Sequence, residues 1–158
     1  MAQTRVFIIV GVALAMAGAW YVFRPETAFI DRQVDEPPPS GKATVLLAGS
    51  FMPRAHEGRG LAHVLELSGS RRVLRFSDFE SLDGPDLYVY LVASPEAADA
   101  EDLERSGFLS LGPLKGNLGA QNYNIPPDAD LTRYRGVVIW CRRFGVNFTT
   151  ALLAAPNP

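Results

Sequence analysis

The sequence predicts an all-β protein: a compact antiparallel β-sandwich of about eight short strands, preceded by one N-terminal transmembrane helix. Two observations predict this class. Short runs rich in β-branched and aromatic residues recur along most of the chain, separated by Gly, Pro, Asn and Asp. One long run without charge stands near the N-terminus. Hydrophobic residues make up 47% and charged residues 20% of the 158 residues, a composition typical of a folded protein.

The first element is an apolar segment, Val6–Phe23, whose 18 residues carry no charge. This length suits a membrane-spanning helix. We therefore expect residues 1–24 to form a single-pass anchor that contacts the membrane through residues 6–23. The alternative is a signal peptide cleaved after Ala19, because Ala17-Gly18-Ala19 has the small-x-small pattern of a cleavage site. Both interpretations place the following domain on the extracytoplasmic side, either tethered to the cell membrane or secreted.

A Pro-rich linker is predicted to follow at residues 25–41. It contains acidic side chains and the run Pro37-Pro38-Pro39, which favours an extended, semi-rigid spacer. Residues 42–158 are then assigned to a single β-sandwich domain.

Eight candidate strands and one short helix make up this domain. The runs Leu87–Val92 and Val137–Trp140 contain no charged or amide side chain, so we expect central strands that are buried on both faces. Only Ser94–Ser106 resembles a helix, beginning at Ser94-Pro95 and ending before Gly107. The candidate strands are Ala43–Phe51, Gly60–Leu67, Arg71–Asp78, Leu87–Val92, Phe108–Leu114, Gln121–Ile125, Gly136–Phe144 and Asn147–Leu152.

Composition and motifs exclude several classes of function. A formal net charge of -2 argues against a nucleic-acid partner. A single cysteine excludes an intramolecular disulfide and any site with several cysteine ligands. Met52, His56, His63 and Cys141 have the residue types of a type-one copper site, but neither His nor Met follows the cysteine. No nucleophile elbow, metalloprotease helix or phosphate loop is present, so no classical enzyme is indicated and the cofactor is unknown.

Cys141 is the redox-capable side chain of the chain. Strand alternation places it on one face with Val137 and Ile139, with Trp140 on the other face. One interpretation is a small buried hydrophobic residue, since free cysteine is among the most buried residue types. The other is a reactive thiol, because the following Arg142 would favour the thiolate. The sequence leaves both open.

A family resemblance joins these features. Four segments follow one another in the order GSFMPRAHEGRGLAHV, RRVLRFSDFESLDGPDLYVYL, GPLKGNLGAQNYNIP and DADLTRYRGVVIWCRRFGVNFTTALL. Over about Ala48 to Leu153 they resemble the DM-thirteen (DM13, "electron transfer") domain family, and the chain is similar to a membrane-anchored single-domain member. The resemblance implies a compact β-sandwich outside the cytoplasm, with a redox role centred on the cysteine of the IWC motif, here Cys141.

The expected site consists of Cys141 and seven supporting residues, of which all but Arg142 match the family pattern. If the loop 115–117 lies near the thiol, Lys115 would add a second positive charge to its surroundings. The supporting residues are Trp140, Arg142, Lys115, Asn117, Tyr123, His56 and Asp86.

Two functions remain open at this point. The first is a membrane-tethered extracytoplasmic DM-thirteen domain with a redox or electron-transfer role through Cys141, acting with a redox partner protein or an envelope ligand. The alternative is a non-catalytic binding or structural module of the cell envelope that recognises polysaccharide or a protein. An exposed thiolate would favour the first function, and a buried cysteine without a cleft would favour the second.

Overall fold

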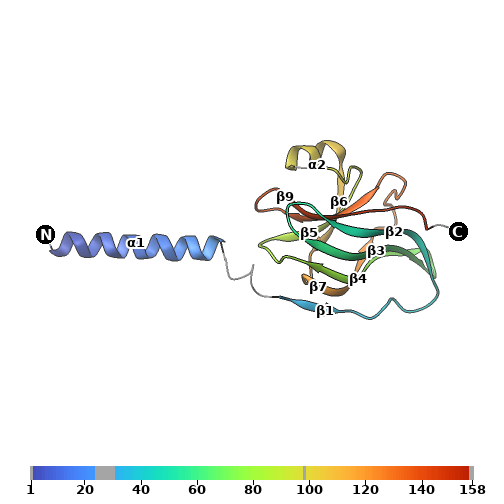
Figure 1. Ribbon diagram of the computed structural model, residues 1–158, viewed down its shortest axis with the longest axis horizontal. Helices are drawn as coiled ribbons and strands as arrows, with labels where there is room; N and C mark the ends of the chain where they lie inside the picture. Colours follow the sequence, from blue (N-terminus) through green and yellow to red (C-terminus); the bar gives the residue numbers. More distant parts are fainter. Residues whose placement is uncertain (1, 24–30, 98, 157–158) are drawn as a thin grey trace.

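The computed structural model describes the backbone of residues 2–23, 31–97 and 99–156 (Figure 1). Two helices and nine strands are present in these ranges. In chain order they are α1 (Ala2–Phe23), β1 (Gln33–Asp35), β2 (Ala43–Pro53), β3 (Gly58–Leu67), β4 (Arg71–Ser81), β5 (Leu87–Val92), α2 (Ala100–Ser106), β6 (Phe108–Pro113), β7 (Leu118–Ile125), β8 (Gly136–Cys141) and β9 (Val146–Leu152).

All nine described strands belong to one sheet, in the order β1-β7-β4-β3-β2-β9-β8-β5-β6. The β1–β7 pair is parallel, and every other pair is antiparallel. The mostly antiparallel β architecture confirms the predicted class. The expectation of about eight strands in two separate sheets is wrong, because β2 pairs with β3 over most of its length and with β9 through Phe51–Pro53. This long strand joins both halves into one sheet that curls into a half-barrel (Figure 1).

The N-terminal apolar segment is helical, as α1. Within the ranges that the structure describes, no helix combines the length and the hydropathy needed to cross a membrane. The prediction of a transmembrane helix at Val6–Phe23 is therefore not supported.

The range assigned to the linker contains strand β1. Its residues Gln33–Asp35 pair in parallel with Leu118–Ala120 of β7. Backbone contacts continue beyond the strand, since the Glu36 N–H donates to the carbonyl of Ala120 at 2.9 Å. This part of the segment is therefore docked on the edge of the sheet.

Helix α2 is shorter than predicted. It begins after Asp99, whose side chain accepts a hydrogen bond from the Asp102 N–H at 2.9 Å, so Asp99 and not Ser94 is the N-cap. The stretch from Ser94 forms a turn instead, in which the Ala97 N–H donates to the Ser94 carbonyl at 3.3 Å. The predicted end is confirmed, because Gly107 caps the helix with φ 85°.

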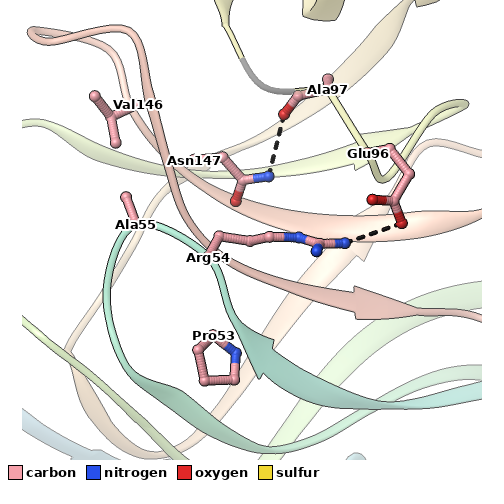
Figure 2. A pocket seen from close by; sticks show the side chains of 7 residues that line it. All are labelled: Pro53, Arg54, Ala55, Glu96, Ala97, Val146 and Asn147. Atoms are coloured by element: carbon pink, nitrogen blue, oxygen red, sulfur yellow. Dashed lines mark hydrogen bonds and ion pairs between the residues drawn. The ribbon is translucent and has the colours of Figure 1, made fainter.

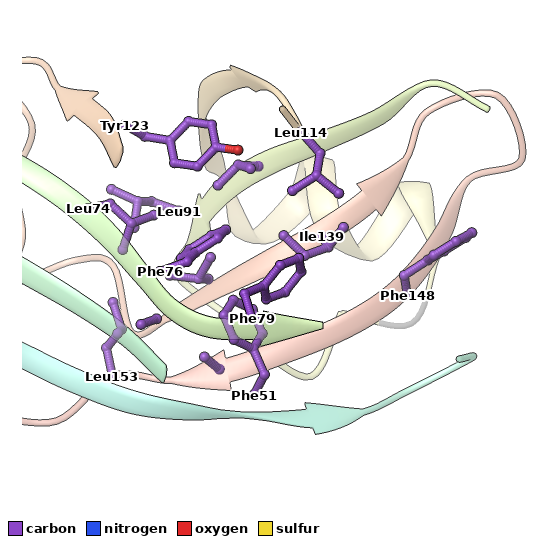
Figure 3. Close-up of a cluster of buried hydrophobic side chains, with 14 of the residues drawn as sticks. Phe51, Leu74, Phe76, Phe79, Leu91, Leu114, Tyr123, Ile139, Phe148 and Leu153 are labelled. Carbon is purple, nitrogen blue, oxygen red and sulfur yellow. The ribbon is translucent and has the colours of Figure 1, made fainter. Parts of the chain in front are cut away.

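The inner face of the curled sheet holds the main core. Leu74 and Phe76 of β4 belong to the same buried cluster as Ile139 of β8, although three strands separate β4 from β8 in the sheet order. Figure 3 shows the rings of Phe76 and Phe79 beside Phe51 in this cluster. A sheet without a second layer can bury its apolar face only by curling over it.

A second cluster covers the outer face of β5 and β8. Tyr90 and Val92 of β5 pack there with Trp140 of β8 and with Leu103 of α2. Because Val89 and Leu91 face the inner core instead, the prediction that these strands are buried on both faces is confirmed. The helix α2 supplies the cover that makes β5 and β8 the most enclosed part of the sheet.

The first testable prediction concerns the inner core. Phe79 is 2% exposed, and its ring centroid lies 4.8 Å from that of Phe51 and 5.0 Å from that of Phe76. We expect Phe79→Ala to lower the free energy of unfolding by about 3–5 kcal/mol in urea titrations. The matched control is Phe144→Ala, because Phe144 is 51% exposed and its loss should cost within about 0.5 kcal/mol. Equal losses in the two variants would contradict this account of the core.

Candidate functional site

Cys141 is the last residue of β8 and is fully buried, with 0% of its surface exposed. Its backbone lies opposite Leu87 of β5. Its side chain belongs to the inner core together with Val137 and Ile139, while Trp140 faces the outer cluster. The predicted alternation of this strand is therefore confirmed, and the thiol is a member of the core.

Hydrogen-bonding groups surround the sulfur within this apolar environment. The thiol donates to the Pro85 carbonyl, with 3.1 Å between Sγ and the oxygen. The backbone N–H groups of Phe144 and Arg143 hydrogen-bond to the sulfur from the turn that follows β8. Loss of solvation on burial raises the pKa of Cys141. The two N–H groups and the Arg143 charge lower this pKa, but the effect of burial is larger, and the net pKa is higher than usual. The group is therefore a neutral thiol at pH 7.

The loop that carries Pro85 is shaped by its own residues. Asp83, Gly84 and Asp86 are residue types that favour turns. The Asp83 carboxylate accepts a hydrogen bond from the Gly84 N–H at 2.8 Å. A Cβ on Gly84 would lie 2.9 Å from the Phe148 ring, so this residue allows the loop to pack against the core. Asp86 has φ 68° and directs the chain from the loop into β5.

Arg142 extends along the other face of the sheet. Its Nε lies 3.3 Å from Oδ2 of Asp86, and its guanidinium carbon lies 4.1 Å from the centroid of Tyr88. Tyr88 packs against the outer cluster, whereas Cys141 lies in the inner one. The cation is therefore used in a cation–π contact and an exposed ion pair on the opposite side of the sheet from the thiol.

Lys115 is paired away from the thiol. Its Nζ lies 2.7 Å from Oε1 of Glu36 and 2.7 Å from the carbonyl oxygen of Asn122, and it stands 5.1 Å from the centroid of Tyr123. Desolvation acts to raise the pKa of Glu36, but the hydrogen bonds from Lys115 and from the Asn122 N–H outweigh it, and the net pKa is lowered. The ammonium group therefore neutralises Glu36 and holds the segment that follows β1.

Tyr123 and Gln121 form a buried polar network behind Lys115. The Tyr123 hydroxyl donates to Oε1 of Gln121 at 2.7 Å and accepts from the Lys115 N–H at 3.1 Å. Gln121 also bonds both backbone groups of Gly116. Burial raises the pKa of Tyr123 far above its usual range, so the hydroxyl stays protonated. The network fixes the loop between β6 and β7.

Asn117 is 1% exposed and connects two distant segments. Its Oδ1 accepts from the Arg32 N–H at 2.7 Å, while its Nδ2 donates to the Ser81 carbonyl at 3.1 Å and to Asp31 at 2.9 Å. Asn117 thus lies between the segment at β1 and the loop that leads to Pro85. The Asn117 side chain therefore positions the backbone of these two segments.

His56 lies apart from these groups. The His56 ring packs on Phe148, with 4.1 Å between the centroids, and the backbone N–H of His56 donates to the Phe148 carbonyl at 3.1 Å. Among the side chains that the structure describes, no group of three or more His, Cys, Asp or Glu residues is placed to hold a metal ion.

At the start of β5 and the end of β8 the structure thus pairs Arg142 with Asp86 on the outer face, where Trp140 also lies, and separates them from the thiol of Cys141 on the inner face. It gathers Lys115, Asn117 and Tyr123 in a second group at β7.

Sequence reasoning missed two contributors, because each acts through tertiary contacts. Pro85 contributes a backbone carbonyl, which no side-chain pattern reveals. Arg32, from the predicted linker, pairs with Asp83.

One open surface pocket, of about 420 Å³, has among its lining residues Val146, which pairs with Cys141 in the ladder of β8 and β9 (Figure 2). Arg54 and Glu96 form an ion pair of 3.0 Å across it. The Nδ2 of Asn147 donates to the Ala97 carbonyl at 3.3 Å at its edge. None of the residues expected at the redox site lines this pocket.

Comparison with known proteins identifies the class. A family model described as "Electron transfer DM13" matches residues 50–153. The chain therefore belongs to the electron transfer DM13 family, as its resemblance indicates. No curated protein and no solved structure matches the chain.

The second prediction follows from the raised pKa of the buried thiol. Below the ordinary thiol pKa of about 8.5, wild type keeps the full contribution of the neutral group to stability. As pH rises above that value towards the folded-state pKa, this contribution is lost, because ionisation is easier in the unfolded chain. The free energy of unfolding of wild type should therefore fall relative to Cys141→Ala between about pH 8 and about pH 10.

Urea titrations of both proteins across this range measure the difference. The buried tyrosines titrate in both proteins and cancel in the comparison. A constant difference, or one that grows in favour of wild type, would contradict the raised pKa.

Proposed function

We propose that this DM13 domain takes part in electron transfer and that Cys141 is the group that gives up the electron. Family membership supports a redox role. The observation that carries the assignment is the set of hydrogen-bonding groups around the sulfur, namely the Pro85 carbonyl and two backbone N–H groups. These partners satisfy a neutral thiol, and the N–H groups also stabilise a sulfur that has lost its proton.

Burial favours one-electron transfer over thiol–disulfide exchange. Exchange requires a second sulfur to reach Cys141, which is 0% exposed. In one-electron oxidation the S–H bond breaks and leaves a thiyl radical. The electron passes to an external one-electron acceptor, and the proton is released to bulk water through local opening of the fold. Electron transfer does not require the acceptor to touch the sulfur.

Aromatic side chains lead from the thiol to the surface. Trp140 adjoins Cys141 in the chain and lies opposite Tyr88 in the ladder of β5 and β8. The Tyr88 and Tyr90 centroids are 6.1 Å apart, and Tyr88 is partly exposed. These oxidisable rings would carry the electron outward to a partner protein.

The third prediction tests this function with hexacyanoferrate(III), a one-electron oxidant, added to the full chain. We expect wild type to reduce about one equivalent, because the proposed step releases one electron from each thiol, and Cys141→Ala to reduce none. Tyr88→Phe should keep the stoichiometry and slow the reaction, since it removes an oxidisable phenol from the route. Tyr134→Phe is the matched control and should behave as wild type. Equal reduction by wild type and Cys141→Ala would overturn the assignment to Cys141.

A second candidate is a non-catalytic binding or structural module of the cell envelope, recognising polysaccharide or a protein. The full burial of Cys141 favours it, as does the open pocket with the Arg54–Glu96 pair. The same titration separates the two candidates, because a purely binding module would leave hexacyanoferrate(III) unreduced while remaining folded. We assign no nucleic-acid partner to either.

We also propose that the segment Val6–Phe23 directs the domain to the extracytoplasmic side. Support comes from its lack of charge and from the pattern Ala17-Gly18-Ala19. The domain would then remain at the cell membrane or be released by cleavage after Ala19.

The fourth prediction concerns this location. In a bacterial host with an envelope, the full chain should fractionate outside the cytoplasm and be accessible to added protease. The substitution Leu14→Arg should retain it in the cytoplasm, because a central charge opposes insertion by about 2.5–3.5 kcal/mol. The control Ser40→Arg adds the same charge outside the apolar segment and should be exported normally. The mass of the mature chain distinguishes retention from cleavage after Ala19, and an intact wild-type chain in the cytoplasm would contradict the proposal.

A further inference from the structure

The segment Asp31–Pro37, called here the N-terminal arm, is fitted closely to the sheet edge. The Arg32 carbonyl accepts from the Leu118 N–H at 3.2 Å. A Cβ on Gly119 would lie 2.2 Å from the Val34 carbonyl oxygen, and Gly119 has φ +95°. Only a residue without a side chain lets the arm approach β7 this closely. The arm is therefore seated in a place shaped for it.

The arm also contacts the loop Ser81–Asp86, called here the thiol loop. Arg32 Nη2 lies 3.1 Å from Oδ1 of Asp83. The Asp83 side chain is 3% exposed, whereas that of Arg32 is 51% exposed. A carboxylate that is buried to this extent is costly without a cation. Among the described residues, Arg32 is the cation that forms an ion pair with Asp83. The packed position of the thiol loop therefore depends on the docked arm.

Asn117 provides a second connection between the arm and the thiol loop. Its side chain bonds the Arg32 N–H and Asp31 on one side and the Ser81 carbonyl on the other. The Ser81 N–H in turn donates to the Asn117 carbonyl at 2.9 Å. Release of the arm would thus remove two hydrogen bonds from Asn117, the residue that holds Ser81 at the start of the thiol loop, as well as the cation from the centre of the loop.

The far end of the thiol loop covers the sulfur. The Asp83 carboxylate that binds Arg32 also holds the Gly84 N–H at 2.8 Å, immediately before Pro85. The Pro85 carbonyl lies 3.1 Å from Cys141 Sγ, and the Asp86 carbonyl accepts from the Arg142 N–H at 3.1 Å. A continuous series of contacts therefore runs from the arm to the thiol.

We propose that docking of the N-terminal arm controls access to Cys141, with Arg32 and Asp83 as positioning residues. When the arm is docked, the thiol loop holds the Pro85 carbonyl against the sulfur and excludes solvent. When the arm leaves, Asp83 loses its cation, the loop opens and solutes reach the thiol. This regulation deepens the proposed redox function and rests on it for its biological meaning, but access itself is measured without any redox assay.

The fifth prediction uses the rate at which a thiol reagent, 5,5′-dithiobis(2-nitrobenzoate), labels the folded full chain. Arg32→Ala should label about tenfold faster than wild type, because local opening becomes easier. Arg32→Lys keeps a cation and should restore the rate to within about threefold of wild type. The infrared S–H stretch should shift in Arg32→Ala as the hydrogen bond to Pro85 weakens, and it should return in Arg32→Lys.

Two further variants separate local opening from general destabilisation. Arg72 bonds the carbonyls of Ala129 and Pro126 at the other end of β4, so Arg72→Gln is the matched control and should label as wild type. Gly119→Ala displaces the arm at Val34 without touching the thiol loop and should accelerate labelling. It also serves if Arg32→Ala does not fold.

The outcomes are distinct. Unchanged labelling in Arg32→Ala and Gly119→Ala would overturn the control of access, as would equal acceleration by Arg72→Gln at matched stability. Failure of hexacyanoferrate(III) reduction with accelerated labelling would instead contradict the redox function and leave the control of access standing.

Discussion

Burial of one apolar face by a single sheet is the constraint on which this structure depends. The inner side chains of β4 and β8 form one cluster, with Phe76 and Ile139 both fully buried. Because all the described strands lie in one sheet and none of them forms a separate second layer, the sheet curls over itself, and the long strand β2 carries the curl from one half to the other. Loops and polar side chains then cover the parts of the core that the strands leave exposed.

Tyr123 connects the core with this closure. Its ring stands 5.3 Å from that of Phe76, while its hydroxyl bonds Gln121 and the backbone of Lys115. Packing thereby fixes the loop between β6 and β7, which includes Asn117 and receives the N-terminal arm. The thiol of Cys141 is held by the same type of arrangement, an apolar environment with a few fixed hydrogen-bonding groups. Such groups are worth more inside the core, where water does not compete.

The position of Cys141 changes what a redox role would require. The sequence suggested that Arg142 would favour a thiolate, but its guanidinium lies over Tyr88 on the other face of the sheet. Desolvation then dominates, and the pKa of the thiol is raised. Any reaction at this sulfur must start from a neutral thiol that is enclosed by the fold. Such a group is suited to one-electron transfer, or to reaction after local opening, and is a poor nucleophile while it is enclosed.

Periodicity and local chemistry were enough to predict several elements. Alternation in Val137–Cys141 gives the face of each residue, the apolar run Leu87–Val92 gives a strand buried on both sides, and Gly107 gives the end of α2, because each depends on neighbours in the chain. The family of the chain also follows from its motifs.

Contacts between distant residues could not be derived in this way. Nothing in the local sequence indicates that Arg32 pairs with Asp83 or that Lys115 pairs with Glu36. Nor does it indicate that the strands form one continuous sheet in place of the two sheets of a sandwich. The sequence by itself determined the β class, the strand faces and the family of this protein. Only the tertiary structure decided that its thiol is neutral and enclosed, because desolvation and long-range pairing depend on which segments the fold brings together.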